Sequence, residues 1–134
     1  MISVKGEGIE LRRTLDSEET IHIDKFQFTT ALLNILENAV KYCSGSPKID
    51  CIISSKESYF KIEIADNGMG ISKENQKQIF DKFFRIDQNE IHNVKGLGLG
   101  LYYTNEIIKA HDGKIDIDSK PGSGSTFTIT IPLN

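Results

Sequence analysis

The sequence predicts a two-layer α/β sandwich, in which a mostly antiparallel mixed sheet packs against helices. Strand-like and helix-like segments come in groups along the 134 residues, without the regular strand–helix alternation of a parallel sheet. The first long helical segment carries its apolar residues on one face, and that face needs a sheet to cover it. With 38% hydrophobic and 26% charged residues, the composition is that of an ordinary globular protein.

The first half of the chain predicts two short strands, one long helix and a hairpin. Apolar and polar residues alternate in GIELRRTL and TIHI, which predicts the two strands. A helix is expected over about 24–42, with Asp24 and Gln27 as a capping box. The segments KIDCIIS and SYFKIEIA then predict two antiparallel strands. The apolar face of the helix consists of Phe28, Leu32, Ile35, Leu36 and Ala39.

The second half predicts a short helix, a connection and a final hairpin around a second long helix. The short polar helix is expected over about 72–80, and the lid-like connection over about 84–95. KIDID and STFTITI predict a hairpin that closes across the turn 119–124.

The second long helix is expected over about 98–112. Its spacing places Tyr103, Ile107 and Ala110 on the side that faces the core. Gly113 follows directly and is the natural C-terminal cap, because glycine adopts the left-handed conformation without steric cost.

Composition also excludes several classes of function. The net charge is −3 and the basic residues are scattered, which argues against a nucleic-acid partner. Cys43 and Cys51 lack the spacing of a zinc site, so we expect packed, reduced thiols in a reducing compartment. The beginning MISVKGEGIELRR has no signal-peptide pattern. We therefore expect a cytoplasmic protein, or the cytoplasmic part of a larger membrane receptor.

A polar stripe on the first long helix is the first candidate for chemistry. Asn34, Glu37, Asn38 and Lys41 follow one another at helical spacing, so they lie on one side. Such a stripe fits a solvated face. It also fits a magnesium site, because amide oxygens are suitable ligands for a hard cation that keeps several waters and substrate phosphates.

Two glycine-containing segments are the second candidate. Asp66 ends a predicted strand in DNGMGI, where a carboxylate can accept a hydrogen bond from an exocyclic amine; a simple turn is the competing interpretation. The run GLGLGL precedes a helix and fits either a flexible hinge or an anion site made of bare N–H groups. Neither segment matches the P-loop or the Rossmann pattern.

Five segments together carry a family resemblance. NILENAVKY, DNGMGI, IFDKFFR, GLGLGL and GSGSTFTITIP resemble, in order and spacing, the N, G1, F and G2 boxes and closing strand of sensor histidine kinases. The resemblance implies the ATP-binding catalytic domain of the superfamily that includes gyrase, the heat-shock chaperone and MutL, with its Bergerat α/β sandwich. It covers essentially residues 1–134, so we expect a single catalytic domain here, with no phosphoacceptor or sensor domain.

The resemblance also implies roles for single residues. Asn38 would bind Mg²⁺, Asn34 would face the phosphates of ATP, and Asp66 would accept the adenine amino group. Lys41 would approach a phosphate and Tyr42 the adenosine. The residues implied around the base are Gly68, Gly70, Ile71, Ser125 and Thr126. The residues implied near the phosphates are Arg85, Gly96, Leu97, Gly98, Leu99, Gly100 and Leu101.

The implied activity is transfer of the γ-phosphate of Mg-ATP to a histidine on a separate dimerisation domain, with a response regulator downstream. Asn34, Lys41 and Arg85 are the expected catalytic residues. Hydrolysing relatives have a glutamate at the position of Asn34, so we expect slow intrinsic hydrolysis. His22, His92 and His111 lack the setting of a phosphoacceptor. An anti-sigma-factor-type serine kinase and a non-catalytic nucleotide-dependent binding module are the alternatives.

Overall fold

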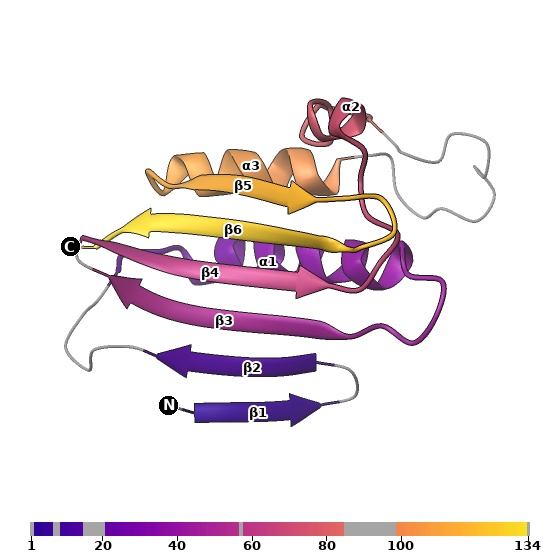
Figure 1. Cartoon of the computed structure of the whole chain (residues 1–134). Helices are drawn as coiled ribbons and strands as arrows, with labels where there is room; N and C mark the ends of the chain where they lie inside the picture. The colour runs from indigo at the N-terminus through magenta and orange to yellow at the C-terminus, as the bar shows by residue number, and fades with distance from the viewer. Residues whose placement is uncertain (1, 7–8, 15–20, 57, 85–98, 134) are drawn as a thin grey trace.

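The computed structural model describes residues 2–6, 9–14, 21–56, 58–84 and 99–133. Within them, six strands form one sheet in the order β1-β2-β3-β4-β6-β5. The strands are β1 (Ile2–Gly6), β2 (Ile9–Thr14), β3 (Ile49–Lys56), β4 (Tyr59–Asp66), β5 (Lys114–Ser119) and β6 (Ser125–Pro132). The helices are α1 (Lys25–Lys41), α2 (Lys73–Gln76) and α3 (Gly100–Ala110). Figure 1 shows α1 and α3 on the same face of the sheet.

The topology confirms the predicted fold class. Every pair of neighbouring strands is antiparallel except β2 and β3, which run parallel. A parallel pair needs a crossover connection, and α1 lies between these two strands in the chain. The molecule is therefore a mostly antiparallel mixed sheet with helices packed on it.

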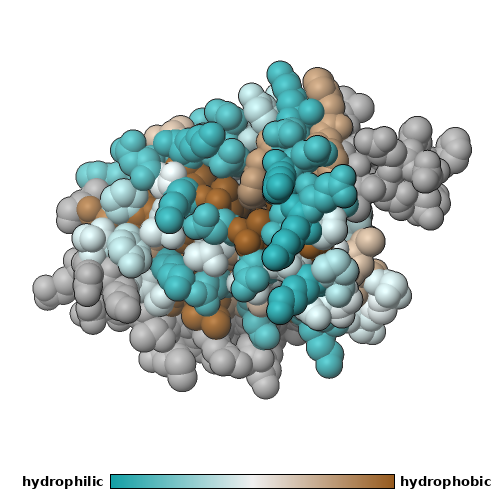
Figure 2. All heavy atoms as spheres, turned by 45° about the horizontal axis from the view of Figure 1, so that its top comes forward, coloured by the Kyte–Doolittle hydropathy of each residue, from teal (hydrophilic) through white to brown (hydrophobic). Residues whose placement is uncertain are grey.

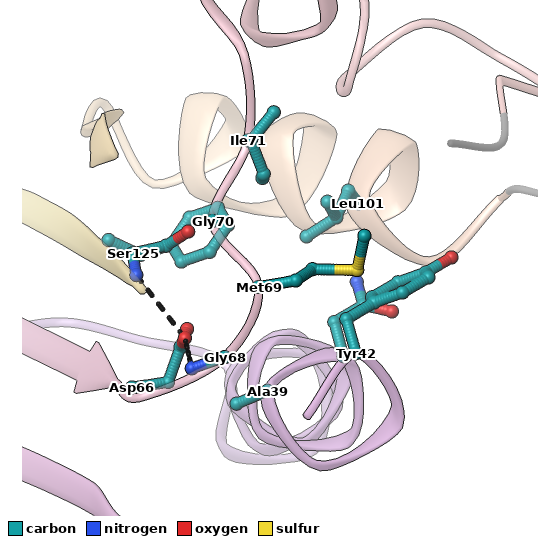
Figure 3. Close-up of a pocket in the computed structure, with 11 residues that line it drawn as sticks. Ala39, Tyr42, Asp66, Gly68, Met69, Gly70, Ile71, Leu101 and Ser125 are labelled. Carbon is teal, nitrogen blue, oxygen red and sulfur yellow. Dashed lines mark hydrogen bonds between the residues drawn. The ribbon is translucent and has the colours of Figure 1, made fainter. Parts of the chain in front are cut away.

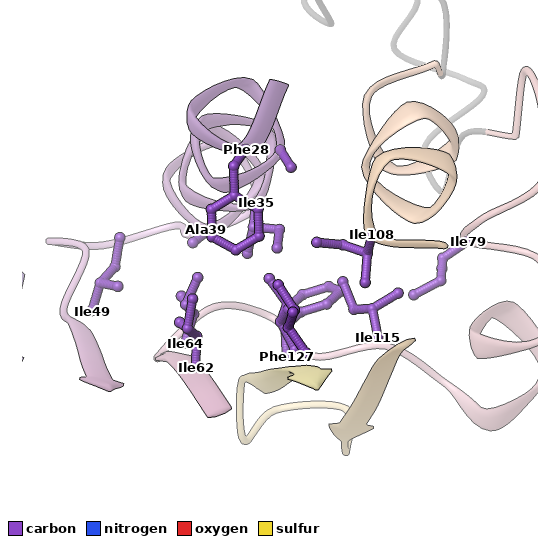
Figure 4. Packing of buried hydrophobic residues seen from close by; sticks show 13 residues of the cluster. Phe28, Ile35, Ala39, Ile49, Ile62, Ile64, Ile79, Ile108, Ile115 and Phe127 are labelled. Atoms are coloured by element: carbon purple, nitrogen blue, oxygen red, sulfur yellow. The ribbon is translucent and has the colours of Figure 1, made fainter. Parts of the chain in front are cut away.

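The core lies between the helices and the sheet (Figure 4). Ile35 of α1, Ile108 of α3 and Ile129 of β6 are completely buried. Burying one such side chain contributes about 1.5–3 kcal/mol, so this layer supplies much of the stability of the fold. Phe28 and Ala39 are also buried, which confirms the predicted apolar face of α1.

The predicted elements agree with the structure in most places. GIELRRTL contains β2, and both predicted hairpins are present as β3–β4 and β5–β6. The predicted strand at TIHI is wrong in its described part, because residues 21–24 lead straight into α1. β1 was not predicted, since the alternation in its five residues is too short to indicate a strand without its partner β2. α2 is shorter than the predicted helix over 72–80.

The core-facing side of α3 differs from the prediction. Thr104 and Ile108 are the buried residues, whereas Tyr103 is 49% exposed. Ala110 is exposed as well, and Ile107 is partly buried against the core. Thr104 tolerates burial because its hydroxyl donates to the carbonyl of Gly100 at 2.9 Å. The sequence pattern missed this face because its central residue is polar.

The cap at the end of α3 is shifted by one residue from the prediction. Asp112, rather than Gly113, has the left-handed conformation, with φ of 60°. The N–H of Gly113 donates to the carbonyl of Ile108 at 2.9 Å, and that of Asp112 donates to Lys109 at 3.0 Å. This pair of bonds is a Schellman motif.

The start of α1 is tied to the end of α3. The Asp24 side chain accepts from the N–H of Gln27 at 2.9 Å, which confirms Asp24 as the N-cap. The N–H of Asp24 donates to Nε2 of His111 at 2.9 Å, and Nδ1 of His111 bonds the carbonyl of Ile107 at 2.7 Å. In the predicted capping box the side chain of Gln27 would accept from the N–H of Asp24, and His111 takes that place.

The surface is mostly hydrophilic on the face shown in Figure 2, with hydrophobic atoms exposed in patches between polar side chains. No helix in the described parts of the chain combines the length and apolarity that a membrane crossing requires. Cys43 and Cys51 are free, partly buried thiols, and burial raises the pKa of Cys51 above its usual value of 9.0.

Candidate functional site

A pocket opens between the C-terminal half of α1, the loop after β4, the start of α3 and the start of β6 (Figure 3). It holds about 400 Å³ of empty space, including its open mouth. Segments that are far apart in the sequence meet there, because the sheet brings the end of β4 beside the start of β6. The lining residues are Asn38, Ala39, Tyr42, Asp66, Gly68, Met69, Gly70, Ile71, Leu101, Ser125 and Phe127.

Asp66 is the charged residue among those that line the pocket. It ends β4, opposite Ser125 of β6 in the register of the sheet. Its Oδ1 accepts two backbone N–H groups, from Gly68 at 2.8 Å and from Ser125 at 3.2 Å. These bonds fix the carboxylate in place (Figure 3). Neither of them uses Oδ2, so Asp66 keeps acceptor capacity for a ligand with a hydrogen-bond donor.

Gly68 allows the chain to pass close to this carboxylate. A Cβ at position 68 would lie 2.9 Å from Oδ1 of Asp66 and 3.0 Å from the carbonyl oxygen of Tyr42. A larger residue would therefore push against both the carboxylate and the end of α1. The glycine leaves a flat, bare stretch of backbone beside the acidic group, which suits the approach of a planar ring.

The loop that follows Asp66 is held on two sides. The N–H of Met69 donates to the carbonyl of Tyr42 at 3.0 Å, and the carbonyl of Met69 accepts from the N–H of Gly122 at 2.8 Å. Asn67 fixes the loop that leads from α1 to β3: its Oδ1 accepts from the N–H of Lys48 at 2.8 Å, and its Nδ2 donates to the carbonyl of Ser46 at 3.2 Å.

The polar stripe on α1 faces this site in part. Asn38 lines the pocket, and Asn34 lies one turn earlier, with its Nδ2 donating to the carbonyl of Gly100 at 3.1 Å. Glu37 and Lys41 are exposed. The Nζ of Lys41 lies 5.3 Å from the centre of the Tyr42 ring, at the C-terminal end of the helix.

The structure brings most of the sequence-predicted residues together. Eight line the pocket directly: Asn38, Tyr42, Asp66, Gly68, Gly70, Ile71, Leu101 and Ser125. Asn34 and Gly100 contact each other beside it, and Leu99 is the N-cap residue of α3. Thr126 is absent from the lining residues. Arg85, Gly96, Leu97 and Gly98, and the predicted lid beyond Phe84, lie outside the described residues.

Sequence reasoning missed three lining residues. Ala39 was predicted to lie on the apolar face of the first long helix, and Phe127 belongs to the segment STFTITI that was predicted as a strand. Both join the core, and their position at the pocket has no separate signal in the sequence. Met69 lies inside the DNGMGI motif, so its neighbours could have indicated it. Ala39, Met69 and Phe127 make the pocket an apolar slot with a carboxylate inside it.

The lining suits a planar, partly apolar ligand that carries a donor group. The apolar side chains of the lining can cover the flat surfaces of such a ligand, and Asp66 can accept a hydrogen bond from its edge. No cluster of three or more His, Cys, Asp or Glu residues that could hold a metal ion occurs in the described segments. A divalent cation at this site would therefore depend on amide oxygens, water and the ligand itself.

Comparison with known proteins agrees with this description. Residues 23–134 match the family model described as histidine kinase-, DNA gyrase B-, and HSP90-like ATPase. Sensor protein RprX of Bacteroides fragilis is 40% identical over 117 residues, which are 84% of this chain and 22% of RprX. Sensor histidine kinase WalK of Bacillus subtilis is 35% identical over 131 residues, which are 96% of this chain and 21% of WalK.

A solved structure extends the likeness to the fold. Full-length ShkA in complex with AMPPNP matches with a TM-score of 0.76 and 26% identity, over 95% of this chain and 26% of that one. The chain belongs to the histidine kinase-, DNA gyrase B-, and HSP90-like ATPase family. It corresponds to the ATP-binding catalytic domain of sensor histidine kinases, and spans about a fifth of the length of RprX and WalK.

Proposed function

We propose that this chain is one domain over residues 1–134 that binds Mg-ATP and donates the γ-phosphate to a histidine on a separate dimerisation domain. The observation that carries the proposal is the fixed carboxylate of Asp66 inside an apolar slot. A carboxylate there selects a ligand with a donor on its edge, as the amino group of adenine provides. AMPPNP, an analogue of ATP, is bound in the related ShkA structure, which supports the same ligand class here.

The lining residues fit an adenine ring. Gly68 and Gly70 leave room at the backbone, Ile71 and Leu101 supply apolar contact, and Tyr42 adds an aromatic side chain to the lining. In this proposal Asp66 accepts from the exocyclic amine through Oδ2. Ser125, whose N–H bonds Oδ1, adds a hydroxyl beside it.

The residues present also fit one Mg²⁺ ion bound together with a nucleotide. In this proposal Asn38 supplies its amide oxygen, and the remaining ligands are phosphate oxygens and water, which is the usual coordination of Mg²⁺ with a nucleotide. The ion, when bound, neutralises charge on the phosphates. Lys41 adds a positive charge at the same end of α1. Gly96 to Leu101, leading into α3, offer N–H groups to the phosphates, and Arg85 acts on the γ-phosphate.

Slow hydrolysis in the absence of an acceptor follows from Asn34. An amide cannot take a proton from water, so no general base stands at this position. The Nδ2 of Asn34 is committed to the carbonyl of Gly100, which ties α1 to the start of α3. Asn34 therefore positions the start of α3, which binds the phosphates in this proposal. Because no group at position 34 activates water, the phosphoryl group passes to a protein histidine.

The partners follow from the relatives. The sensor protein RprX and the sensor histidine kinase WalK are about four to five times as long as this chain, so the phosphoacceptor domain and the downstream response regulator belong to the rest of such a system. We place the domain in the cytoplasm, as part of a membrane-bound sensor or as a separate component, with no nucleic-acid partner.

Titration with Mg-ATP tests the site. We expect Asp66→Asn to weaken ATP binding at least tenfold, because it exchanges a charged acceptor for a weaker, neutral one. Asn38→Ala should lower the affinity for Mg-ATP while leaving ATP binding in EDTA unchanged. If both variants bind Mg-ATP like the parent, the pocket is misassigned.

Phosphotransfer is tested with a separately produced phosphoacceptor domain and ATP labelled at the γ-phosphate. Acid-labile label on histidine supports the proposed function. Acid-stable label indicates a serine kinase, and binding of ATP without any label indicates a nucleotide-dependent binding module. Rapid hydrolysis by the chain alone would contradict the role assigned to Asn34.

A further inference from the structure

The hydroxyl of Ser119, the last residue of β5, lies among three polar atoms beside the pocket. Its Oγ accepts from the N–H of Ile71 at 2.7 Å and donates to the carbonyl of Gly124 at 2.9 Å. The same oxygen lies 2.7 Å from Oγ of Ser125. Ile71 and Ser125 both line the pocket, so Ser119 connects two of its walls from behind.

Counting hydrogens determines the direction of the contact between the two serines. A serine hydroxyl has one hydrogen and two lone pairs. The carbonyl of Gly124 can only accept, so it takes the hydrogen of Ser119. Ile71 uses one lone pair of Ser119, which leaves the other for Ser125. Ser125 must therefore be the donor in this contact.

This direction has a consequence inside the pocket. Because the hydrogen of Ser125 is committed to Ser119, its oxygen can offer only lone pairs to a ligand. The neighbouring carboxylate of Asp66 is also an acceptor, and the two groups are linked by the N–H of Ser125 at 3.2 Å from Oδ1. Two acceptors, Oδ2 of Asp66 and Oγ of Ser125, therefore belong to residues that line the same pocket. The exocyclic amino group of a purine can donate to them, whereas an exocyclic oxygen at the same position would face them without a hydrogen.

We propose that Ser119 is a positioning residue that sets the base preference of the pocket. By holding Ser125 as an acceptor, Ser119 favours a purine with an amino group at position 6 over one with an oxygen there. This proposal rests on the proposed function, since it requires a purine nucleotide in the pocket.

A second set of bonds allows Ser119 to be changed without losing the wall of the pocket. The Nε2 of Gln76 donates to the carbonyl of Ile71 at 2.7 Å and to the carbonyl of Ser119 at 3.0 Å. Both are backbone acceptors, so they persist in Ser119→Ala. Removal of the hydroxyl therefore frees the Ser125 hydrogen while Ile71 stays tied to β5 through Gln76.

The test compares displacement of a fluorescent ADP analogue by ATP and by inosine triphosphate, the 6-oxo counterpart of ATP. We expect Ser119→Ala to reduce the preference for ATP about three- to tenfold, because Ser125 can then turn its hydrogen toward an oxygen. Ser119→Thr, which keeps the hydroxyl, should retain the preference of the parent. Ser123→Ala, an exposed serine of the same turn, should also leave it unchanged.

A double-mutant cycle shows whether Ser119 acts through Ser125. In a Ser125→Ala background, Ser119→Ala should not change the preference further. Three results would overturn the proposal. The preference could change equally in both backgrounds, it could stay unchanged in Ser119→Ala, or inosine triphosphate could displace the probe from neither the parent nor Ser119→Ala. Ser119→Gly, which also removes the hydroxyl, provides the same comparison if the alanine variant does not fold. A parent protein that binds no ATP would instead overturn the proposed function.

Discussion

Gly122 and Gly124 lie in the turn between β5 and β6 and form a matched pair for a test of the packing around Asp66. Both are in the left-handed region, with φ of 83° and 78°. A Cβ at position 122 would meet no atom within 4 Å, whereas one at position 124 would lie 2.0 Å from the carbonyl oxygen of Asp66. Alanine at either position carries the same backbone cost, and only Gly124→Ala adds a collision.

The magnitudes follow from these two contributions. An alanine in the left-handed region costs about 1–2 kcal/mol, and about 0.4–1 kcal/mol of that is offset by the smaller entropy of the unfolded chain. Gly122→Ala should therefore destabilise by about 1 kcal/mol. Overpacking adds about 1–3 kcal/mol, so Gly124→Ala should destabilise by about 2–4 kcal/mol. For a chain of 134 residues, about 1 kcal/mol corresponds to about 3–4 °C in Tm.

Thermal and urea denaturation of both variants measure this difference. Gly124→Ala should melt about 7–14 °C below the parent, and Gly122→Ala about 3–4 °C below it. Because the displaced carbonyl belongs to Asp66, Gly124→Ala should also bind ATP more weakly at a temperature where it is folded. Equal destabilisation by the two substitutions would refute the reasoning from the close contact at Gly124.

Three further substitutions test other parts of the structure. Asn67→Asp replaces the donor to the carbonyl of Ser46 by an oxygen, so the free energy of unfolding in urea should fall by about 1–2 kcal/mol. Stability equal to that of the parent would show that this hydrogen bond is unimportant. His111→Ala removes the acceptor for the N–H of Asp24 and should lower the free energy of unfolding by about 1–2 kcal/mol in the same assay. An unchanged urea midpoint would contradict this prediction. Because burial raises the pKa of Cys51, its thiol ionises first in the unfolded chain. The free energy of unfolding should therefore decline as the pH rises above 9.0, and Cys51→Ala should reduce that decline. If the variant loses stability with pH as steeply as the parent, Cys51 is not the group responsible.

The sequence predicted those features that depend on neighbours along the chain. The cap at Asp24 and the alternation in β4 and β6 are local patterns, and each appeared where expected. The lining residues of the pocket were recognised because they fall in short motifs with a family resemblance, such as DNGMGI around Asp66 and Gly68.

Features that depend on distant contacts could not be predicted. Thr104 looks like a polar surface residue, yet it is buried because Gly100 and Ala31 offer carbonyl acceptors to its hydroxyl. His111 replaces a predicted capping partner because the end of α3 meets the start of α1 only in the folded chain. The bond from the N–H of Ile71 to Ser119 likewise joins the loop after β4 to the end of β5, and no sequence pattern indicates that these two segments lie close together.

The central claim is that α1, the end of β4 and the start of β6 converge on one adenine nucleotide. A crystal structure with Mg²⁺ and a non-hydrolysable ATP analogue tests it most directly. The account predicts the exocyclic amine within hydrogen-bond distance of Oδ2 of Asp66, and the amide oxygen of Asn38 on the metal. A nucleotide bound outside this pocket, or a base whose amine points away from Asp66, would contradict it.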